Sequence, residues 1–453
     1  MLEKFKHIYF LGIGGIGMSA LARYFYAKNF AVSGYDKTST KLTNQLQKEG
    51  IAISFKDQGK RVVEHLPEKG QTLIVFTPAV PPDHEELIYF KANGYKISKR
   101  AEVLGMITRQ MQGITVAGTH GKTTCSTMLS HVLYHSEKGC NAFLGGLSTN
   151  YNTNLLLNDQ SQRVVIEADE FDRSFLHLNP FASILTSTEA DHLDIYKDLA
   201  TIEHAFQEFI LRINKKGVLV KHYTIPFEGK CRSITYGLLP NQKTDFLGNN
   251  LRVENENFVM DVTTPKSFWK DVVLGLPGIH NAENALAVIA IADYLGVKES
   301  VIRTSLASFS GIKRRFECHV KTPEMVYIDD YAHHPSAIKK LVESVRLLYP
   351  NKSICGVFQP HLYSRTADFM DDFAHALSQL DELILLPIYP AREKPREGIT
   401  SKALLALIKL RKKKVLSPKE ALIAVKKMKK GVLLTIGAGD IDQLVEPIKS
   451  TLS

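Results

Sequence analysis

Short apolar runs alternate with amphipathic stretches along almost the whole of this 453-residue chain. Apolar runs of about five residues predict buried strands, and apolar positions at helical spacing predict helices. The predicted strands cover residues 7–12, 72–77, 114–118, 163–167, 182–186, 217–221, 325–329, 353–358, 383–387 and 432–436. The predicted helices cover residues 18–28, 123–136, 281–295, 336–348 and 366–380. This alternation is typical of an α/β fold with largely parallel sheets.

The length of the chain exceeds what one hydrophobic core can organise, and it predicts about three domains of roughly 150 residues. Two strand–glycine-loop–helix units, near residues 12 and 118, would each normally begin a sheet, which places a boundary near residue 110. A second boundary falls near Arg314, after a long apolar helix. We therefore expect domains at residues 1–110, 111–314 and 315–453.

The first glycine loop, Gly12-x-Gly14-x-x-Gly17, directly follows an apolar strand and precedes a helix. Glycines at this spacing let the backbone turn tightly and approach a diphosphate at the helix N-terminus. Asp36 ends a second strand-like segment nineteen residues after Gly17, where a ribose-binding carboxylate belongs. The spacing alone does not identify the nucleotide. NAD in an oxidoreductase and a strand–helix crossing without a ligand are the alternatives.

The second glycine loop, GTHGKTT at residues 118–124, lies between a predicted strand and a predicted helix. Val116 stands where the strict phosphate-loop pattern has its first glycine. The two glycines of the loop nevertheless free backbone N–H groups to face phosphates. Lys122 would supply a point charge, and the Thr123 hydroxyl can ligate Mg²⁺. We expect Lys122 to be an exposed loop residue.

The presence of two different mononucleotide loops narrows the function. A dehydrogenase needs only the first loop and a plain ATPase needs only the second. The pair therefore favours an enzyme that holds two phosphorylated substrates.

Charge and cysteine content restrict the partners. The net charge of +10 and the pI of about 9.1 suit nucleic acid or small polyanions. We interpret the most basic stretch, residues 402–430, as the solvated face of a helix, and we recognise no nucleic-acid-binding module, so we expect no nucleic-acid partner. The five cysteines form no CxxC pair, which indicates reduced thiols rather than disulfides or a zinc site.

Two observations concern the membrane. No signal-peptide pattern precedes the first predicted strand, and the longest apolar run, residues 285–292, is too short to span a bilayer. We expect a cytoplasmic protein without a membrane partner.

Further motifs accompany the two loops in order along essentially the whole chain. They are IEADEFD (166–172), EADHLDIY (189–196), PGIHNAENALA (277–287), GIKRRFE (311–317), DDYAHHP (329–335), FQPHLYSRT (358–366) and IGAGDI (436–441). With the GTHGKTT loop, this set resembles the Mur ligase family. The GIGGIGMSALA start, the histidine of GTHGKTT and the DDYAHHP block are similar to the branch that adds L-alanine.

The resemblance implies a three-domain Mur ligase architecture. A Rossmann-like N-terminal domain would bind the UDP part of a sugar nucleotide, which reassigns the first glycine loop from NAD to UDP. A central P-loop ATPase-like domain would bind ATP, and a Rossmann-like C-terminal domain would contact the amino acid and ATP.

The implied activity is that of an ATP-dependent acid–amino-acid ligase of peptidoglycan precursor synthesis. It would join L-alanine to the carboxylate of UDP-N-acetylmuramate through an acyl phosphate, using ATP and Mg²⁺, as a monomer or homodimer. A ligase that recycles whole murein peptides is a rival in the same class. A DNA-stimulated ATPase and an NAD oxidoreductase are rivals from other classes.

The resemblance also assigns roles to individual residues. UDP-sugar binding falls to Gly12, Gly14, Gly15, Gly17 and Asp36. ATP binding falls to Gly118, Thr119, His120, Gly121, Lys122, Thr123, Thr124, Asn281, Asn284, Arg315 and Asp330. The metal ligands would be Thr123, Glu167 and His192, and the amino-acid contacts Tyr331, His333, His361 and Arg365. The catalytic set comprises Lys122, Glu167, His192, His333 and Arg365.

Several of these assignments have an alternative. Glu167 could form a structural salt bridge, and Glu170 is the second choice as a metal ligand. His192, taken alone, suits a capping or surface position, and Asn281 suits a helix N-cap. Arg314 is the second choice for the phosphate-contacting arginine.

Two features depart from the family pattern. Leu362 stands where arginine often follows the FQPH motif, so one expected cation is missing. The segment HAFQEFI, residues 204–210, holds no lysine, although other members of the family carry a carbamylated lysine in this neighbourhood. Lys197 is the nearest lysine, but it lies too close to the Asp-His pair of EADHLDIY, and we expect no carbamate.

Overall fold

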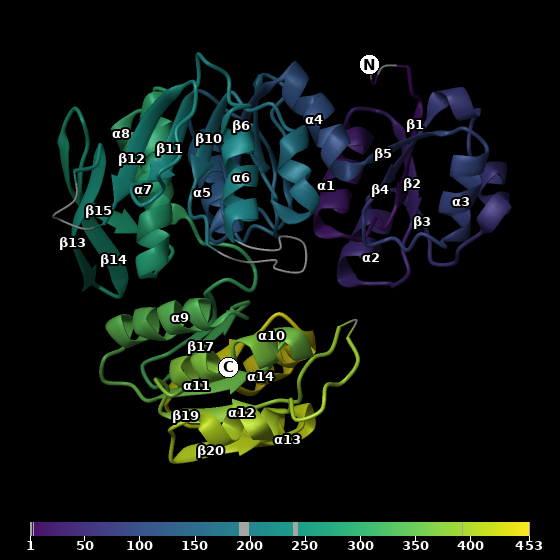
Figure 1. The fold of residues 1–453 in the computed structure, drawn as a ribbon. Helices are drawn as coiled ribbons and strands as arrows, with labels where there is room; N and C mark the ends of the chain where they lie inside the picture. The colour runs from purple at the N-terminus through teal and green to yellow at the C-terminus, as the bar shows by residue number, and fades with distance from the viewer. Residues whose placement is uncertain (1, 3, 190–198, 239–242, 392, 453) are drawn as a thin grey trace. The chain divides into compact units, whose positions relative to one another are not determined.

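The structure is a computed structural model that describes the chain except residues 1, 3, 190–198, 239–242, 392 and 453 (Figure 1). The chain divides into two compact units. The first comprises Met1–Asn249, Asp261–Val272 and Glu283–Phe309, and the second comprises Asn250–Met260, Val273–Ala282 and Ser310–Ser453.

The N-terminal part of the first unit is a five-stranded parallel sheet with the order β3-β2-β1-β4-β5. Its strands are β1 (His7–Leu11), β2 (Ala31–Tyr35), β3 (Ala52–Ser54), β4 (Thr72–Phe76) and β5 (Lys96–Lys99). Its helices are α1 (Ile16–Ala27), α2 (Lys41–Lys48), α3 (Glu85–Ala92) and α4 (Arg100–Gln110), with 3₁₀ helices η1 (Gly59–His65) and η2 (Lys69–Gln71). The strand order reverses between β1 and β4, and ligands of such sheets bind in the crevice at that point.

A ten-stranded sheet follows, with the order β15-β14-β13-β12-β11-β10-β6-β9-β7-β8. Its strands are β6 (Gln112–Ala117), β7 (Asn141–Phe143), β8 (Leu155–Leu156), β9 (Arg163–Glu167), β10 (Ala182–Leu185), β11 (Val218–His222), β12 (Arg232–Gly237), β13 (Phe246–Glu254), β14 (Asn257–Thr263) and β15 (Phe268–Leu274). Its helices are α5 (Lys122–Tyr134), α6 (Leu199–Ile210), α7 (Ile279–Tyr294) and α8 (Glu299–Ser308), with 3₁₀ helix η3 (Phe171–His177). Strand β6 runs parallel to β10 on one side and β9 on the other, so the loop after β6 leaves the interior of the sheet.

The C-terminal sheet has six strands in the order β16-β17-β21-β18-β19-β20, and only the β16–β17 pair is antiparallel. Its strands are β16 (Glu317–Lys321), β17 (Met325–Asp330), β18 (Ile354–Phe358), β19 (Glu382–Leu385), β20 (Lys412–Val415) and β21 (Gly431–Ile436). Its helices are α9 (Pro335–Leu348), α10 (Tyr363–Asp368), α11 (Met370–Leu377), α12 (Ser401–Leu407), α13 (Pro418–Val425) and α14 (Val445–Leu452), with 3₁₀ helix η4 (Asp440–Leu444).

The cores lie where the apolar strands predict them. All five positions of β1 and of β18 are buried, as expected for parallel strands covered on both faces. One apolar cluster of the first unit includes Phe10, Phe25, Phe175 and Phe209, and one of the second includes Tyr327, Val357 and Leu433. None of the helices in the described part of the chain is both long and apolar enough to cross a membrane.

The α/β class with largely parallel sheets is confirmed, but two local predictions are wrong. The predicted helix over residues 366–380 is two helices, α10 and α11, which meet at Phe369 with backbone angles φ −121° and ψ 27°. The lysines at 412–414 do not lie on a helix face; they form most of β20, an edge strand of the C-terminal sheet. Charged edge strands resist pairing with other chains, which gives these lysines a structural reason.

Candidate functional site

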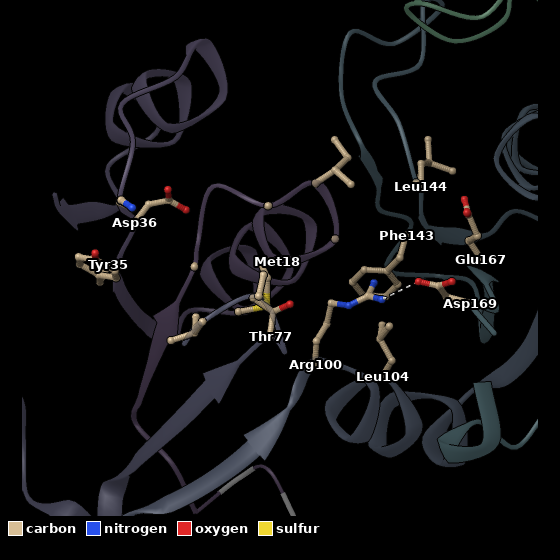
Figure 2. Close-up of a pocket in the computed structure, with 18 of the residues that line it drawn as sticks. Met18, Tyr35, Asp36, Thr77, Arg100, Leu104, Phe143, Leu144, Glu167 and Asp169 are labelled. Carbon is tan, nitrogen blue, oxygen red and sulfur yellow. Dashed lines mark ion pairs between the residues drawn. The ribbon is translucent and has the colours of Figure 1, made fainter. Parts of the chain in front are cut away.

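The first glycine loop opens onto a cavity of about 500 Å³ within the first unit (Figure 2). The loop turns sharply after β1, where Gly12 has a φ of +83°, a value that favours glycine. The cavity is lined from the N-terminal sheet by Gly12, Gly15, Gly17, Tyr35, Asp36, Thr77, His84 and Arg100, and from the ten-stranded sheet by Phe143, Leu144, Gly145, Glu167 and Asp169. Figure 2 shows Tyr35 and Asp36 at one end, Glu167 and Asp169 at the other, and Arg100 between them.

Asp36 lies directly after β2 and holds the glycine loop in place. Its Oδ2 accepts a hydrogen bond of 2.8 Å from the backbone N–H of Gly14, and its Oδ1 accepts one of 3.1 Å from Thr38. A Cβ at position 14 would lie 2.6 Å from Cγ2 of Thr43 and 2.8 Å from Oδ2 of Asp36, so a side chain there would displace Thr43 or Asp36. The structure therefore brings the predicted UDP-sugar residues together around one cavity.

Arg100 is a cavity residue that the sequence analysis missed. It begins α4 just after β5, a strand that the apolar pattern did not predict. Its guanidinium lies against Gly17, where a Cβ would come within 2.4 Å of its Nη1. Its Nη2 also lies 3.8 Å from Oδ2 of Asp169. The glycine loop thus faces a cation that no local motif indicated.

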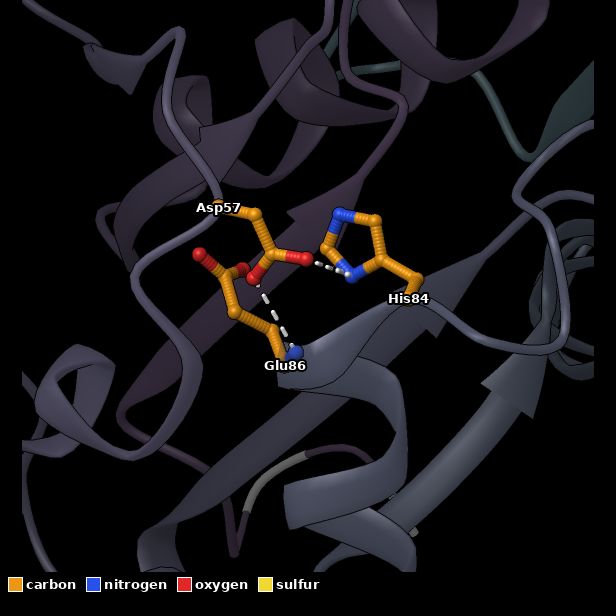
Figure 3. A group of neighbouring side chains, drawn as sticks. All are labelled: Asp57, His84 and Glu86. Atoms are coloured by element: carbon orange, nitrogen blue, oxygen red, sulfur yellow. Dashed lines mark hydrogen bonds and ion pairs between the residues drawn. The ribbon is translucent and has the colours of Figure 1, made fainter.

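A group of three titratable side chains stands beside this cavity (Figure 3). His84 lines the cavity, and its Nδ1 lies 3.5 Å from Oδ2 of Asp57. The Asp57 carboxylate accepts hydrogen bonds from the backbone N–H groups of Gly59, Glu85 and Glu86 at 3.1, 2.9 and 3.2 Å. These bonds fix the start of α3, so we interpret the group as a structural support of the cavity wall.

The second glycine loop joins β6 to α5 in the conformation that its glycines predict. Gly118 and Gly121 have φ values of +130° and +81°. A Cβ at Gly118 would lie 2.2 Å from Oγ1 of Thr186, and one at Gly121 would lie 2.7 Å from Oδ1 of Asn284. The predicted ATP residue Asn284 therefore lies directly at the loop. The N-terminus of α5, which carries Lys122, Thr123 and Thr124, offers a favourable end for phosphate.

Lys122 is not the exposed loop residue that we expected, because its side chain is only 12% exposed. Its Nζ donates hydrogen bonds of 2.8 Å to Oε1 of Glu170, 2.8 Å to the carbonyl of Gly118 and 3.3 Å to that of Thr119. Burial lowers the pKa of Lys122, but the carboxylates of Glu170 and Glu167 outweigh it and raise the pKa overall. The ammonium is thus held charged against the loop.

The two candidate carboxylates differ in their surroundings. Burial raises the pKa of Glu170, which is engaged by Lys122. Glu167 ends β9, and its buried Oε2 has no hydrogen-bond partner within the described part of the chain. No ion pair of Glu167 occurs among the described residues, so the structural salt bridge is not observed. A buried carboxylate oxygen that interacts electrostatically with the lysine of the phosphate loop suits Mg²⁺, which prefers hard oxygen ligands.

Two residues of the second glycine loop, Thr119 and His120, contact Glu189. Thr119 donates through its hydroxyl to the carbonyl of Glu189 at 2.9 Å, and Nε2 of His120 lies 3.4 Å from Oε2 of Glu189. His192, the third predicted metal ligand, lies outside the described residues, as does Lys197.

The start of α7 differs from the prediction. The helix begins at Ile279, so Asn281 lies within its first turn and is not the N-cap; its side-chain amide donates to the carbonyl of Pro277 at 2.5 Å. His280 has a pKa lowered to about 4 by burial and by the positive charges of Lys340 and Arg315. At neutral pH this half-buried histidine is therefore uncharged.

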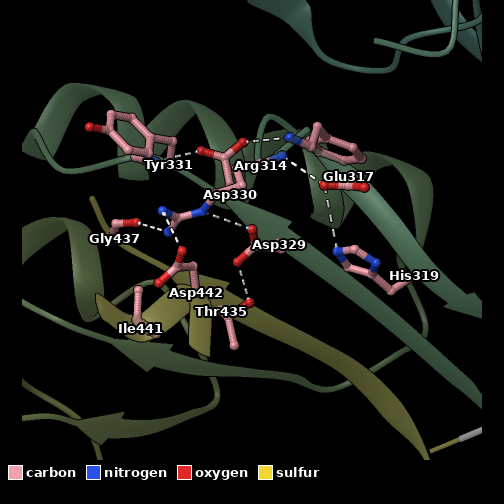
Figure 4. A network of polar contacts seen from close by, with 12 residues as sticks. Arg314, Glu317, His319, Asp329, Asp330, Tyr331, Thr435, Gly437, Ile441 and Asp442 are labelled. Atoms are coloured by element: carbon pink, nitrogen blue, oxygen red, sulfur yellow. Dashed lines mark hydrogen bonds and ion pairs between the residues drawn. The ribbon is translucent and has the colours of Figure 1, made fainter. Parts of the chain in front are cut away.

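In the second unit, Arg314 ties the segment before β16 to the C-terminal sheet (Figure 4). Its Nε lies 3.4 Å from Oδ2 of Asp329, its Nη2 donates to the carbonyl of Gly437 at 2.7 Å, and its guanidinium lies 5.3 Å from the ring centre of Tyr331. The side chain of Arg314 is thus occupied within its own unit.

Asp330 is held by backbone groups. Its Oδ2 accepts from the N–H of Phe316 at 2.8 Å, and its Oδ1 accepts from that of Ala332 at 2.7 Å. Burial raises its pKa to about 6. Each carboxylate oxygen of Asp330 thus already accepts one hydrogen bond, which leaves fewer acceptor sites for the hydroxyl groups of a ribose.

The predicted amino-acid residues form a chain of rings in the second unit. The ring centres of Tyr331 and His333 are 5.3 Å apart, and those of His333 and His361 are 6.2 Å apart. Burial lowers the pKa of His361, and the charge of Arg365 lowers it further. Leu362 adopts a φ of +71° before α10, an unusual conformation for a residue other than glycine.

The chain belongs to the Mur ligase family. Three family models match it in order: "Mur ligase family, catalytic domain" over residues 7–112, "Mur ligase middle domain" over 116–292, and "Mur ligase, glutamate ligase domain" over 314–439. The family predicted from the motifs is therefore confirmed.

Two similar relatives share one description. A UDP-N-acetylmuramate–L-alanine ligase of Porphyromonas gingivalis is 48% identical over 452 residues, which cover 99% of each chain. One of Flavobacterium psychrophilum is 48% identical over 454 residues, covering 100% of this chain and 99% of the relative.

Solved structures agree in fold. The crystal structure of a UDP-N-acetylmuramate–alanine ligase from Thermotoga maritima aligns with a TM-score of 0.83 at 28% identity, covering 98% of this chain and 99% of that one. A murein peptide ligase from Psychrobacter arcticus aligns with a TM-score of 0.71 at 23% identity, covering 99% and 98%, a level that supports the fold alone.

Proposed function

We propose that this chain is an ATP-dependent ligase that joins L-alanine to the carboxylate of UDP-N-acetylmuramate in peptidoglycan precursor synthesis. One structural observation carries the proposal: a single cavity is lined by the first glycine loop and also by Glu167, whose carboxylate neighbours the phosphate loop of Lys122. A sugar nucleotide in this cavity would have one end near the ATP phosphates. The names of the relatives supply the substrates.

The chemistry requires activation of the carboxylate, which is a poor acyl donor. A carboxylate oxygen attacks the γ-phosphorus of ATP, ADP leaves, and an acyl phosphate forms. The amine of alanine then attacks the carbonyl carbon, and the carbon–oxygen bond to phosphate breaks. Lys122 would neutralise phosphate charge during the first step, with Glu170 orienting its ammonium.

Thr123 and Glu167 would hold the metal ion. Mg²⁺, when bound, would offset the negative charge of the phosphates. Among the described residues, the buried Oε2 of Glu167 has no hydrogen-bond partner, as this role requires, and Thr123 lies in the first turn of α5. His192 stays a proposed third ligand.

Within the cavity, the uridine would lie toward Tyr35 and Asp36, and the sugar toward Glu167. This direction follows from the positions of the two ends, because the sugar carries the carboxylate that must meet ATP. The backbone of Gly15 and Gly17, at the N-terminus of α1, would face the diphosphate.

The C-terminal unit would supply the alanine contacts. Nδ1 of His333 lies 2.9 Å from the carbonyl of Tyr331 and must donate its proton there, since a carbonyl only accepts. We propose that the His333 ring, oriented by this bond, contacts the amine of alanine. Arg365 would bind the alanine carboxylate, beside His361.

The remaining assignments are proposed on the same basis. Asn281, Asn284, Arg315 and Asp330 would contact ATP. The chain would divide into a UDP-sugar-binding domain at residues 1–110, an ATP-binding domain at 111–314 and a domain at 315–453 that contacts the amino acid and ATP. The free cysteines are in line with an enzyme that would act in the cytoplasm.

Phosphate release from ATP tests the proposal. The assay has separate arms with UDP-N-acetylmuramate plus L-alanine, the same nucleotide plus a murein tripeptide, DNA alone, and no addition. We expect rapid release only in the first arm. Release that requires the tripeptide would instead indicate a recycling ligase, and release stimulated by DNA would contradict the proposal.

A further inference from the structure

The cavity of the first unit is lined by one arginine, Arg100, which lies between the first glycine loop and the carboxylate of Asp169. On one side its guanidinium lies against Gly17 at the start of α1, where the glycine loop faces the cavity. On the other side its Nη2 lies 3.8 Å from Oδ2 of Asp169. Both side chains line the same cavity, as Figure 2 shows.

The pair with Asp169 is weak. A distance of 3.8 Å is longer than a charge-assisted hydrogen bond, and the side chains of Arg100 and Asp169 are 26% and 38% exposed. Ion pairs of this exposure contribute little, because water screens them. The contact therefore positions Arg100 without committing its donors.

The position of Arg100 suits a diphosphate. The N-terminus of α1, a helix of twelve residues, favours negative charge at Gly15 and Gly17. A guanidinium beside this terminus adds up to five donors in a planar fork that matches phosphate oxygens. No other lysine or arginine except Lys37 is found among the residues that line the described cavity.

We propose that Arg100 is the diphosphate-binding residue of this cavity and that Asp169 competes with the diphosphate for it. This inference rests on the proposed function, which puts a UDP-sugar in the cavity. In the free protein Asp169 partly neutralises Arg100. When the diphosphate enters, the guanidinium exchanges a weak, screened carboxylate contact for bidentate phosphate contacts.

This arrangement predicts opposite effects for the two residues. Arg100→Gln should weaken UDP binding about 10- to 100-fold, the size expected for a lost charge-assisted contact. Asp169→Asn should strengthen UDP binding about two- to fivefold, because it removes a partly exposed competitor. Uridine, which lacks the diphosphate, should bind all three proteins equally.

Calorimetric titration of wild type, Arg100→Gln, Arg100→Lys and Asp169→Asn with UDP and with uridine provides the test. Arg100→Lys should recover part of the affinity, since it restores charge but not the planar fork. Equal losses for UDP and uridine in Arg100→Gln would overturn the inference, because they indicate a packing role. Weaker UDP binding in Asp169→Asn would show that Asp169 does not compete with the diphosphate for Arg100.

The two proposals can fail separately. If wild-type protein binds neither UDP nor uridine, the assignment of a UDP-sugar to this cavity fails. If it binds UDP and the Arg100 variants bind UDP as tightly as wild type does, only the role of Arg100 fails.

Discussion

At the scale of single residues, burial decides what each charged group can do. Lys122 carries the charge that the GTHGKTT motif predicts, but it is enclosed by Glu170 and two backbone carbonyls. The motif predicts the charge of Lys122 near phosphate, but the sequence could not show that the side chain is buried. Glu170 lies 48 residues away and reaches the loop only because β6 pairs with β9.

Lys122→Ala should abolish ATP-dependent phosphate release and also destabilise the protein. Removing one partner of a buried pair leaves the carboxylate of Glu170 uncompensated, at a cost of about 3 kcal/mol. Urea unfolding and the phosphate assay measure the two effects. The matched variant Lys122→Ala/Glu170→Gln should regain most of the stability but no activity. Activity in either folded variant would contradict the phosphate-loop assignment.

His280 predicts a pH dependence of stability. Its pKa is about 4 in the folded chain, below the ordinary value of 6.5, so the unfolded chain binds more protons between these values. The stabilisation is fully present above the ordinary pKa and is lost as the pH falls toward about 4. Between about pH 7 and about pH 5 the loss is about 2 kcal/mol.

A comparison of wild type with His280→Gln isolates this contribution. The neutral amide cannot take up the proton, so the free energy of unfolding of the variant should fall less steeply on acidification. Urea titrations at several pH values measure the difference. Parallel pH curves for the two proteins would show that His280 is not held neutral by the fold.

At the scale of elements, strand ends and their loops build the sites. The segment after β7 passes so close to the end of β9 that a Cβ at Gly145 would lie 2.0 Å from Oε2 of Glu167. The carboxylate therefore depends on a glycine in a neighbouring loop. No motif in the sequence linked these two positions.

Gly145→Ala should displace Glu167 and raise the Mg²⁺ concentration needed for half-maximal activity by about 10-fold, as changes around metal ligands commonly do. Gly70→Ala is the control, because nothing lies within 4 Å of a Cβ at that position. A magnesium titration of both variants decides the matter. An unchanged requirement in Gly145→Ala would argue against Glu167 as a ligand.

The apolar pattern predicted the buried parallel strands well, since these read as continuous apolar runs. It missed the strands between Arg232 and Leu274, whose alternating and exposed positions resemble loops. It also joined α10 and α11, because the break at Phe369 carries no proline or glycine. Arg100 and Asp169 could not be paired from sequence, since only the tertiary fold brings their loops together.

At the scale of the whole molecule, one unit holds both glycine loops and the other holds the residues proposed for alanine. On the proposed function, the first unit would bring the sugar nucleotide to the phosphate loop, where its carboxylate is activated. The second must deliver an amine. The central claim is that an acyl phosphate links the two events.

Isotope transfer tests this claim most directly. The carboxylate of UDP-N-acetylmuramate is labelled with heavy oxygen and incubated with the enzyme, ATP, Mg²⁺ and L-alanine, and the released phosphate is examined by mass spectrometry. An acyl phosphate requires that one labelled oxygen leave with phosphate for each amide bond formed. Formation of the alanine product with unlabelled phosphate, or with the label in AMP, would contradict the account.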